Sequence, residues 1–335
     1  MNIDVHCHII PEECRELRAT AADGREQGIW LERDREGREQ LVIDGRRLNA
    51  SQPEQLWDVD LRLRAMDASR VDLQALSVPP FCYFYSLEGR TAAGFARRLN
   101  DAIAAVVRRH PDRFIGLATV PLQDAALAIK ELDRAVEVLG MRGVEINSNV
   151  AGENLDDPSL HAFFSRVEQL GIPIFIHPHY VAAAERLRDY YLTNLIGNPL
   201  DTSIAAACLV FGGIMTRFPR LNVYLAHGGG NTPYICGRWQ HGWEVRAEPR
   251  RLLDRPPMEF VRRFCFDTIT HSRPALAYLV NTFGSDHVLL GTDYPFDMGD
   301  MRPVETVDAL GLPNADRERI LGGNASRLFH LPGSD

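Results

Sequence analysis

Eight short apolar runs, separated by segments of helical periodicity, limit this 335-residue chain to few folds. The runs are rich in β-branched residues and almost continuously apolar, which is typical of parallel strands buried on both faces. Residues 124–139, between two runs, place apolar side chains on one helical stripe, with Asp124 as a cap and Gly140 as a stop. Eight such units favour an α/β fold closed into a (β/α)8 TIM barrel over an open sheet. We predict strands at Ile3–His6, Val71–Val78, Phe114–Val120, Gly143–Ser148, Pro173–Pro178, Asn222–His227, Phe264–Thr268 and His287–Asp293.

One segment interrupts this alternation soon after the first strand. Residues 12 to about 56 are mostly charged, and Asp44–Gly45 is a good turn between two short strands. We therefore expect a single domain over residues 1–335, with a small insertion at about 12–56. The insertion either lies over the mouth of the barrel, where it would close on a substrate, or is a plain surface excursion.

Composition and charge exclude several classes of protein. The net charge of −8 gives no basic surface for nucleic acid. The longest apolar stretch, Ser203–Met215, is too short to cross a bilayer, and we predict that it is a buried helix. The six cysteines show no C-x-x-C spacing, which favours free thiols in a reducing compartment. Because the first strand begins at Ile3 and leaves no room for a signal peptide, we predict a soluble cytoplasmic protein with no membrane contact.

Polar side chains stand at the ends of four predicted strands. His6 and His8 form a His-x-His pair in the first strand, where alternate side chains point to one face. His177, His227 and Asp293 end the fifth, sixth and eighth strands. Because the carboxyl ends of barrel strands meet at one face, we expect these five side chains to converge. Imidazoles with one carboxylate suit a divalent metal that keeps a position open for water or substrate.

Simpler explanations compete at some of these positions. His179 follows the same strand and is the alternative to His177 as the side chain that points into the barrel. Asp293 would serve equally well as a cap for the segment that follows it. Residues 228–230 form a glycine run that lacks the lysine and Ser/Thr of a phosphate loop, so close backbone packing explains it better. The chain has no Gly-x-Ser-x-Gly elbow, which disfavours serine-hydrolase chemistry. An isolated histidine is more often a hydrogen-bonded structural residue, which is our assignment for His110, His161, His287 and His330.

The motifs at these positions resemble those of the amidohydrolase superfamily. The segments IDVHCH (3–8), IHP (176–178), LAHGGG (225–230) and LGTDYPF (290–296) look like those of the group that contains aminocarboxymuconate semialdehyde decarboxylase. The similarity runs from residue 3 to about 330 and includes RFPRL (217–221) and the pair at 237–238. It implies a metal bound by His6, His8, His177 and Asp293. It also implies that His227 is the acid–base residue, and that Arg238 reaches across a dimer interface to the neighbouring subunit's substrate.

Two departures from the family pattern concern the substrate pocket. The family has a carboxylate-binding arginine after the Asp-Gly turn, where this chain has Asn49, with Arg46 and Arg47 close by. It also has a tryptophan where this chain has Asn194. We therefore take Arg47, Asn194 and Arg238 as the candidate substrate-binding residues.

The sequence thus predicts a metal-dependent, non-oxidative decarboxylase (a carboxy-lyase). Its expected substrate is a small aromatic or unsaturated carboxylic acid, of the aminocarboxymuconate semialdehyde or hydroxybenzoate type. We expect zinc rather than manganese, a homodimer, and an Asp293 that carries a proton as well as binding the metal. One alternative is a hydrolase or hydratase that attacks a lactone, amide or double bond on the same barrel. A second is a catalytically silent scaffold, against which the complete ligand set argues.

Overall fold

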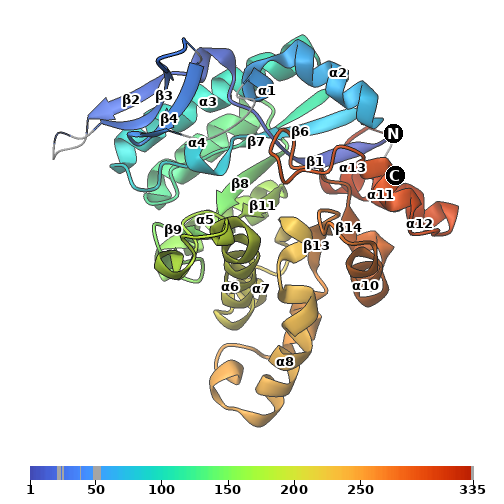
Figure 1. Ribbon diagram of the computed structural model, residues 1–335. Coiled ribbons are helices and arrows are strands. Elements are labelled where there is room, and N and C mark those ends of the chain that lie inside the picture. The colour runs from blue at the N-terminus through green and yellow to red at the C-terminus, as the bar shows by residue number, and fades with distance from the viewer. Residues whose placement is uncertain (21–23, 25, 38, 48–53, 333–335) are drawn as a thin grey trace.

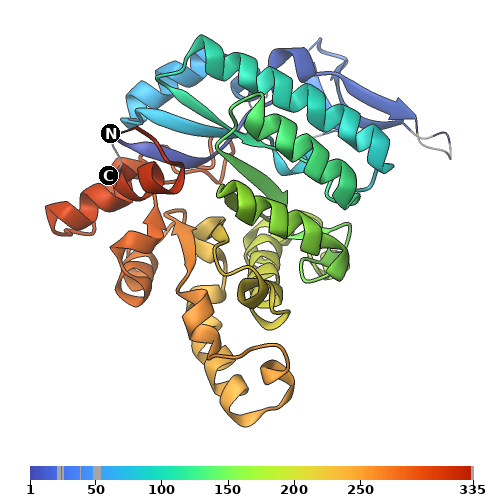
Figure 2. The ribbon, with the colours of Figure 1, turned by 180° about the vertical axis from the view of Figure 1, so that it is seen from behind.

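Eight parallel strands form a barrel in the computed structural model, which describes residues 1–20, 24, 26–37, 39–47 and 54–332 (Figures 1 and 2). The ends of the sheet meet, because Val5 N donates to Leu290 O at 2.9 Å and Cys7 pairs in parallel with Tyr294. The predicted (β/α)8 barrel is confirmed. In sheet order, its strands are β1 (Ile3–His8), β6 (Leu73–Ser77), β7 (Phe114–Ala118), β8 (Gly143–Asn147), β11 (Pro173–His177), β12 (Asn222–Leu225), β13 (Phe264–Asp267) and β14 (Val288–Leu289).

Two strands end earlier than their apolar runs suggest. β12 stops at Leu225 and β14 at Leu289, so the prediction that these strands continue to His227 and Asp293 is wrong. Both of these residues adopt left-handed backbone, with φ 56°, which a strand does not accommodate. Asp293 is nevertheless held beside β1, because its N–H donates to His6 O at 2.7 Å.

Helices cover the outside of the barrel, and their local signals agree with the sequence. Asp124 caps α4, since its Oδ1 accepts from Ala126 N at 3.1 Å and from Leu127 N at 3.0 Å. The predicted helix Ser203–Met215 is instead divided between α6 and α7, because Gly213 takes φ 77°. Within the described residues, none of the helices is both long and apolar enough to cross a membrane. The helices are α1 (Glu54–Trp57), α2 (Val59–Ser69), α3 (Gly89–Arg109), α4 (Ala125–Glu137), α5 (His161–Leu170), α6 (Asn198–Phe211), α7 (Ile214–Arg217), α8 (Thr232–Val245), α9 (Pro257–Val261), α10 (Arg273–Phe283), α11 (Pro303–Asp308), α12 (Asn314–Glu318) and α13 (Asn324–Leu328).

The segment between β1 and α2 forms a separate antiparallel sheet, which lies beside α3 in Figure 1. Its strands are β2 (Leu17–Thr20), β3 (Glu26–Arg33), β4 (Glu39–Ile43) and β5 (Arg46–Arg47). β4 and β5 pair around the Asp44–Gly45 turn, as predicted. Closure of this sheet over a substrate stays a prediction.

Candidate active site

Three histidines at the carboxyl ends of β1 and β11 direct their Nε2 atoms to one place. His6 Nδ1 lies 2.7 Å from Asp267 Oδ2, and His8 Nδ1 lies 2.9 Å from Val78 O. His177 Nδ1 lies 3.1 Å from the carbonyl oxygen of the next residue. Because each Nδ1 faces an acceptor, it carries a ring proton, and Nε2 is the nitrogen that is left to bind a metal. The Nε2 atoms of His6 and His8 are 3.2 Å apart.

Asp293 adds a carboxylate to these imidazoles. Its Oδ1 lies 3.4 Å from His6 Nε2 and 3.2 Å from His8 Nε2, and among the described residues no donor reaches Oδ1 or His177 Nε2. The four ligand atoms, all on buried residues, lie within 4.8 Å of one another. Buried acceptors that face each other without a donor need a cation or a proton between them. Three imidazoles and a carboxylate are ligands that a divalent metal accepts, so the chain has a divalent-metal site that fits its residues.

The electrostatics of the site favour a positive charge beside Asp293. Burial alone would lower the pKa of His6, but the charge of Asp293 and the hydrogen bond to Asp267 raise it to about 10. Burial also opposes the charge of Asp293, yet the charge of His6 and the neighbouring imidazoles hold the pKa of that carboxyl well below its usual range. Burial, with the charges of the other histidines, lowers the pKa of His177 well below its ordinary value. A metal ion competes with these protons, so metal binding releases them.

His227 stands next to this group and is not among the four convergent residues. Its Nε2 lies 3.6 Å from Asp293 Oδ2, whereas His6 and His8 are nearest Oδ1. Among the described residues His227 Nδ1 has no partner, and 16% of the side chain is exposed. A partly exposed imidazole beside a carboxylate can exchange a proton with a bound molecule.

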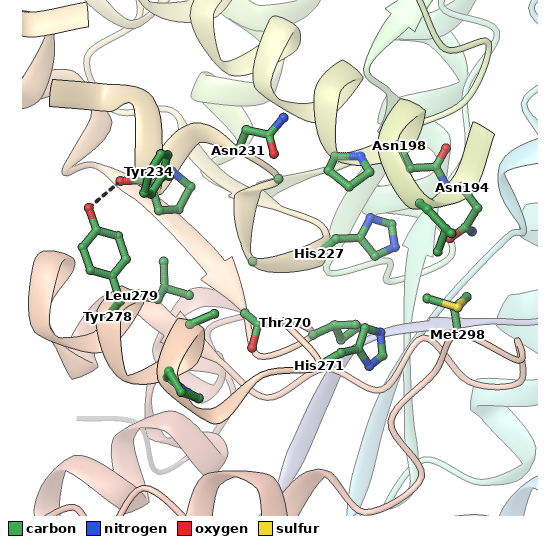
Figure 3. Close-up of a pocket in the computed structure, with 18 residues that line it drawn as sticks. Asn194, Asn198, His227, Asn231, Tyr234, Thr270, His271, Tyr278, Leu279 and Met298 are labelled. Atoms are coloured by element: carbon green, nitrogen blue, oxygen red, sulfur yellow. Dashed lines mark hydrogen bonds between the residues drawn. The ribbon is translucent and has the colours of Figure 1, made fainter. Parts of the chain in front are cut away.

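A cavity of about 660 Å³ adjoins His227, between the loops that follow β12 and β13 (Figure 3). In the figure His227 and His271 lie toward the end with Asn194 and Met298, and Tyr234 and Tyr278 lie toward the other. The cavity walls are largely apolar, and the described residues that line it include neither lysine nor arginine. The cavity can therefore hold an uncharged ring next to the metal site.

The structure brings one of the three predicted substrate-binding residues to this cavity. Asn194 lines it, on a π-helix at Thr193–Gly197. Arg47 is exposed and pairs with Glu32 Oε2 at 3.2 Å. Arg238 is exposed on α8, which projects away from the barrel in both ribbon views (Figures 1 and 2). Asn49, where the family has an arginine, lies outside the described residues.

A polar network fixes β1 against the segment that carries Asp293. The buried carboxylate of Asp4 accepts from His6 N at 3.1 Å, from Thr292 N at 3.0 Å and from Thr292 Oγ1 at 2.6 Å. The guanidinium of Arg62, also buried, donates to His8 O. Because these groups satisfy one another away from water, the network holds the metal ligands of two distant segments in one geometry.

Sequence reasoning missed two buried carboxylates next to the ligands, Asp267 and Glu145. Asp267 ends the apolar run of β13, the same signal that selected the other ligands. Glu145 lies inside β8, where one acid in an apolar run was the only hint. Its Oε1 is 3.9 Å from His8 Nδ1, and among the described residues neither oxygen has a hydrogen-bond partner. Burial raises the pKa of Glu145 to about 8, so this carboxyl is largely protonated at neutral pH.

Comparison with known proteins places this geometry in a family. A family model described as an amidohydrolase matches residues 3–331. The chain belongs to the amidohydrolase family. The motif resemblance that predicted this membership is confirmed.

The relatives of this amidohydrolase include several decarboxylases. The chain is 37% identical to 2-amino-3-carboxymuconate-6-semialdehyde decarboxylase of Dictyostelium discoideum, with 99% of this chain and 92% of the relative covered. The crystal structure of 5-carboxyvanillate decarboxylase from Sphingomonas paucimobilis is 31% identical, with a TM-score of 0.79 over 84% of this chain and 86% of that one. A dihydroxybenzoic acid decarboxylase from Polaromonas, with bound manganese and the inhibitor 2-nitroresorcinol, is 25% identical, with a TM-score of 0.81 over 98% and 97% of the two chains.

Proposed function

We propose that this amidohydrolase is a metal-dependent, non-oxidative decarboxylase of a small aromatic or unsaturated carboxylic acid. The observation that carries the proposal is that four buried acceptor atoms converge beside a partly exposed histidine, His227. His227 in turn lines a largely apolar cavity. The names of the relatives support the reaction class, because all three decarboxylate carboxylic acids. Fold alone would not select this reaction.

In this proposal His6, His8, His177 and Asp293 hold the metal ion through the four atoms described above. A bound divalent cation supplies a Lewis acid, which binds substrate oxygens and stabilises negative charge that develops on them. The imidazole orientations are fixed by their Nδ1 acceptors, so the site needs little rearrangement to bind the ion.

His227 acts as the acid–base residue of the proposed reaction. It delivers a proton to the substrate carbon that bears the carboxylate. The electron pair of the carbon–carboxylate bond then remains on the ring or chain, and CO2 leaves without charge. Solvent then supplies a proton to that imidazole, and Asp293 Oδ2, 3.6 Å from His227 Nε2, can relay this proton after a small ring movement.

The cavity beside His227 is the proposed binding site for the body of the substrate. Its volume of about 660 Å³ lies within the range of small-molecule sites, and its apolar walls suit an aromatic ring. Asn194 would contact the substrate from one wall. Arg47 is engaged by Glu32 and exposed, so a role for it requires a side-chain movement.

Arg238 would complete the site of a second copy in a homodimer. Two facts support this proposal: the described residues that line the cavity include neither lysine nor arginine, and Arg238 is exposed on the projecting helix α8. A guanidinium can bind a carboxylate through two parallel hydrogen bonds. With a net charge of −8, the protein needs such a local cation to hold an acidic substrate.

Zinc is the metal that we propose, in a cytoplasmic enzyme. Histidine nitrogen with one carboxylate is a common zinc ligand set, although the relative from Polaromonas holds manganese. All six cysteines, each at a described position, are free thiols, which suits a reducing compartment. Elemental analysis of protein purified without added metal decides between the two ions.

Release of CO2 tests the proposed reaction. Metal-depleted protein is reloaded with Zn²⁺ or Mn²⁺ and incubated with hydroxybenzoates and with muconate-type acids. We expect CO2 and the product without the carboxyl group from at least one acid, and none from the metal-depleted protein. A product that gains the elements of water without CO2 release would identify a hydrolase or hydratase instead. Lack of turnover by metal-loaded protein across both acid classes would contradict the proposal.

A further inference from the structure

One buried carboxylate links the metal ligands to the loop that carries His227. Asp267 is the last residue of β13 and is fully buried. Its Oδ2 accepts from His6 Nδ1 at 2.7 Å and from His227 N at 2.8 Å. Its Oδ1 accepts from Gly228 N at 2.7 Å and from Ile269 N at 3.0 Å. Four donors therefore satisfy both oxygens of this carboxylate, which lies away from water.

The bond to His6 determines which nitrogen of that imidazole can bind a metal. Because Nδ1 donates its proton to Asp267, the lone pair is on Nε2, the atom 3.4 Å from Asp293 Oδ1. Gly291 Cα is close enough that an added Cβ would lie 3.0 Å from Asp267 Cβ and 3.1 Å from His6 Cβ. The Cβ atoms of Asp267 and His6 are thus packed against Gly291, and the hydrogen bond to Asp267 Oδ2 opposes rotation of the imidazole.

Two of the other three hydrogen bonds of Asp267 shape the turn after β12. His227 takes φ 56°, and the three glycines after it take φ 61°, 76° and 62°. Left-handed conformation is unfavourable for a histidine, so the surrounding structure must hold it. Successive N–H groups in such a turn point to one side and bind an anion. Here the anion is the Asp267 carboxylate, which accepts from His227 N and Gly228 N.

We propose that Asp267 is a positioning residue that fixes the tautomer of His6 and the turn that places His227. The same oxygen, Oδ2, receives both the imidazole proton of the ligand and the backbone N–H of the acid–base residue. A change at Asp267 therefore disturbs metal binding and proton transfer together. The inference rests on the metal site of the proposed function, but it does not depend on which acid is decarboxylated.

The test compares Asp267→Asn with a matched control, Asp201→Asn. Asp201 is also buried, and it accepts from Ser148 Oγ, from Asn149 Nδ2 at 2.8 Å and from Ala182 N at 3.0 Å. None of those partners is a metal ligand.

Zn²⁺ affinity is measured without substrate, by competition with a chelator. We expect Asp267→Asn to bind Zn²⁺ about 10- to 100-fold more weakly than wild type, because an amide cannot accept all of the donors that the carboxylate accepts. Asp201→Asn should keep wild-type affinity, even if both variants lose stability.

Turnover at saturating metal separates the two halves of the proposal. Once excess Zn²⁺ has restored occupancy, Asp267→Asn should still show a lower kcat, by about 10-fold or more, because His227 is displaced. Wild-type Zn²⁺ affinity in folded Asp267→Asn would overturn the proposal, as would equal weakening in Asp201→Asn. Full kcat at saturating Zn²⁺ would overturn the part that concerns His227.

A measurement on the wild-type protein covers the case in which Asp267→Asn does not fold. In the Zn²⁺-loaded protein with ¹⁵N-labelled histidine, His6 should carry its proton on Nδ1, with a slowly exchanging signal at low field. A proton on His6 Nε2 would overturn the proposal without any variant. None of these affinity or spectroscopic results depends on finding the substrate, so failure of the decarboxylase assay and failure of this inference are distinguishable.

Discussion

Replacement of His227 by alanine tests whether this residue moves protons or binds the metal. The four convergent ligand atoms do not include His227, whose Nε2 is 3.6 Å from Asp293 Oδ2. Asp267 binds the backbone N–H of His227 and not its ring, so the turn should survive removal of the side chain. We therefore expect His227→Ala to keep its metal and to lose turnover.

The size of the loss follows from the exposure of His227. A positioned acid–base group contributes about 10²- to 10⁴-fold to a rate, equal to roughly 3–5 kcal/mol of transition-state free energy. Because 16% of this side chain is exposed, water can enter the vacated space and act as a weaker proton source. We therefore expect a loss near the lower limit, about 10²-fold in kcat. The left-handed backbone costs alanine and histidine similar energy, so stability should change little.

The assay is kcat for CO2 release at saturating Zn²⁺, together with the zinc content of the same sample. His227→Asn is a useful second variant, because asparagine adopts left-handed backbone readily yet cannot carry a proton at neutral pH. His110→Ala is the control, since His110 follows α3 and belongs neither to the residues that line the cavity nor to the metal-ligand group. Near-normal turnover in His227→Ala would refute the acid–base role. Joint loss of zinc and turnover would make His227 a ligand.

Three further predictions address stability and assembly. Burial raises the pKa of Glu145 from its ordinary 4.5 to about 8, so this carboxyl ionises at a lower pH in the unfolded chain than in the folded protein. The wild-type protein therefore loses stability as the pH rises from 4.5 to about 8. In metal-depleted protein, the free energy of unfolding of Glu145→Gln should therefore rise by about 2 kcal/mol relative to that of wild type between pH 5.5 and 7.5. Free energies from urea unfolding that change with pH in the same way in both proteins would contradict this. Arg238→Ala and His227→Ala chains should recover activity when mixed, because one site of the mixed dimer is intact; absence of rescue in proven mixed dimers would remove Arg238 from the site. Gly230→Ala should lower the urea midpoint of unfolding, since the new Cβ would lie 2.1 Å from Pro199 O and the backbone has φ 62°. The control Gly237→Ala should not lower it, because Gly237 lies in a helix and its added Cβ would meet no atom within 4 Å.

The barrel and the candidate metal ligands could be predicted from the sequence because most of their signals are local. Apolar runs of strand length, helical stripes and caps such as Asp124 depend on neighbours within a few residues. The same is true of His6 and His8, whose spacing places both imidazoles on one face of a strand. His177 and Asp293 followed from one topological rule, that the carboxyl ends of barrel strands share a face.

Contacts between residues far apart in the sequence could be decided only by the tertiary structure. Asp267 is 261 positions from the imidazole that it orients, and Asp4 is 288 positions from Thr292. Both acids lie in or at the end of an apolar run, but no local pattern names their partners, since the packing of the strands decides which groups form hydrogen bonds. The left-handed turn at His227, which ends β12 two residues early, likewise depends on a carboxylate of the neighbouring strand. Local periodicity thus determines which elements form, and packing between distant segments determines the hydrogen bonds that orient the site.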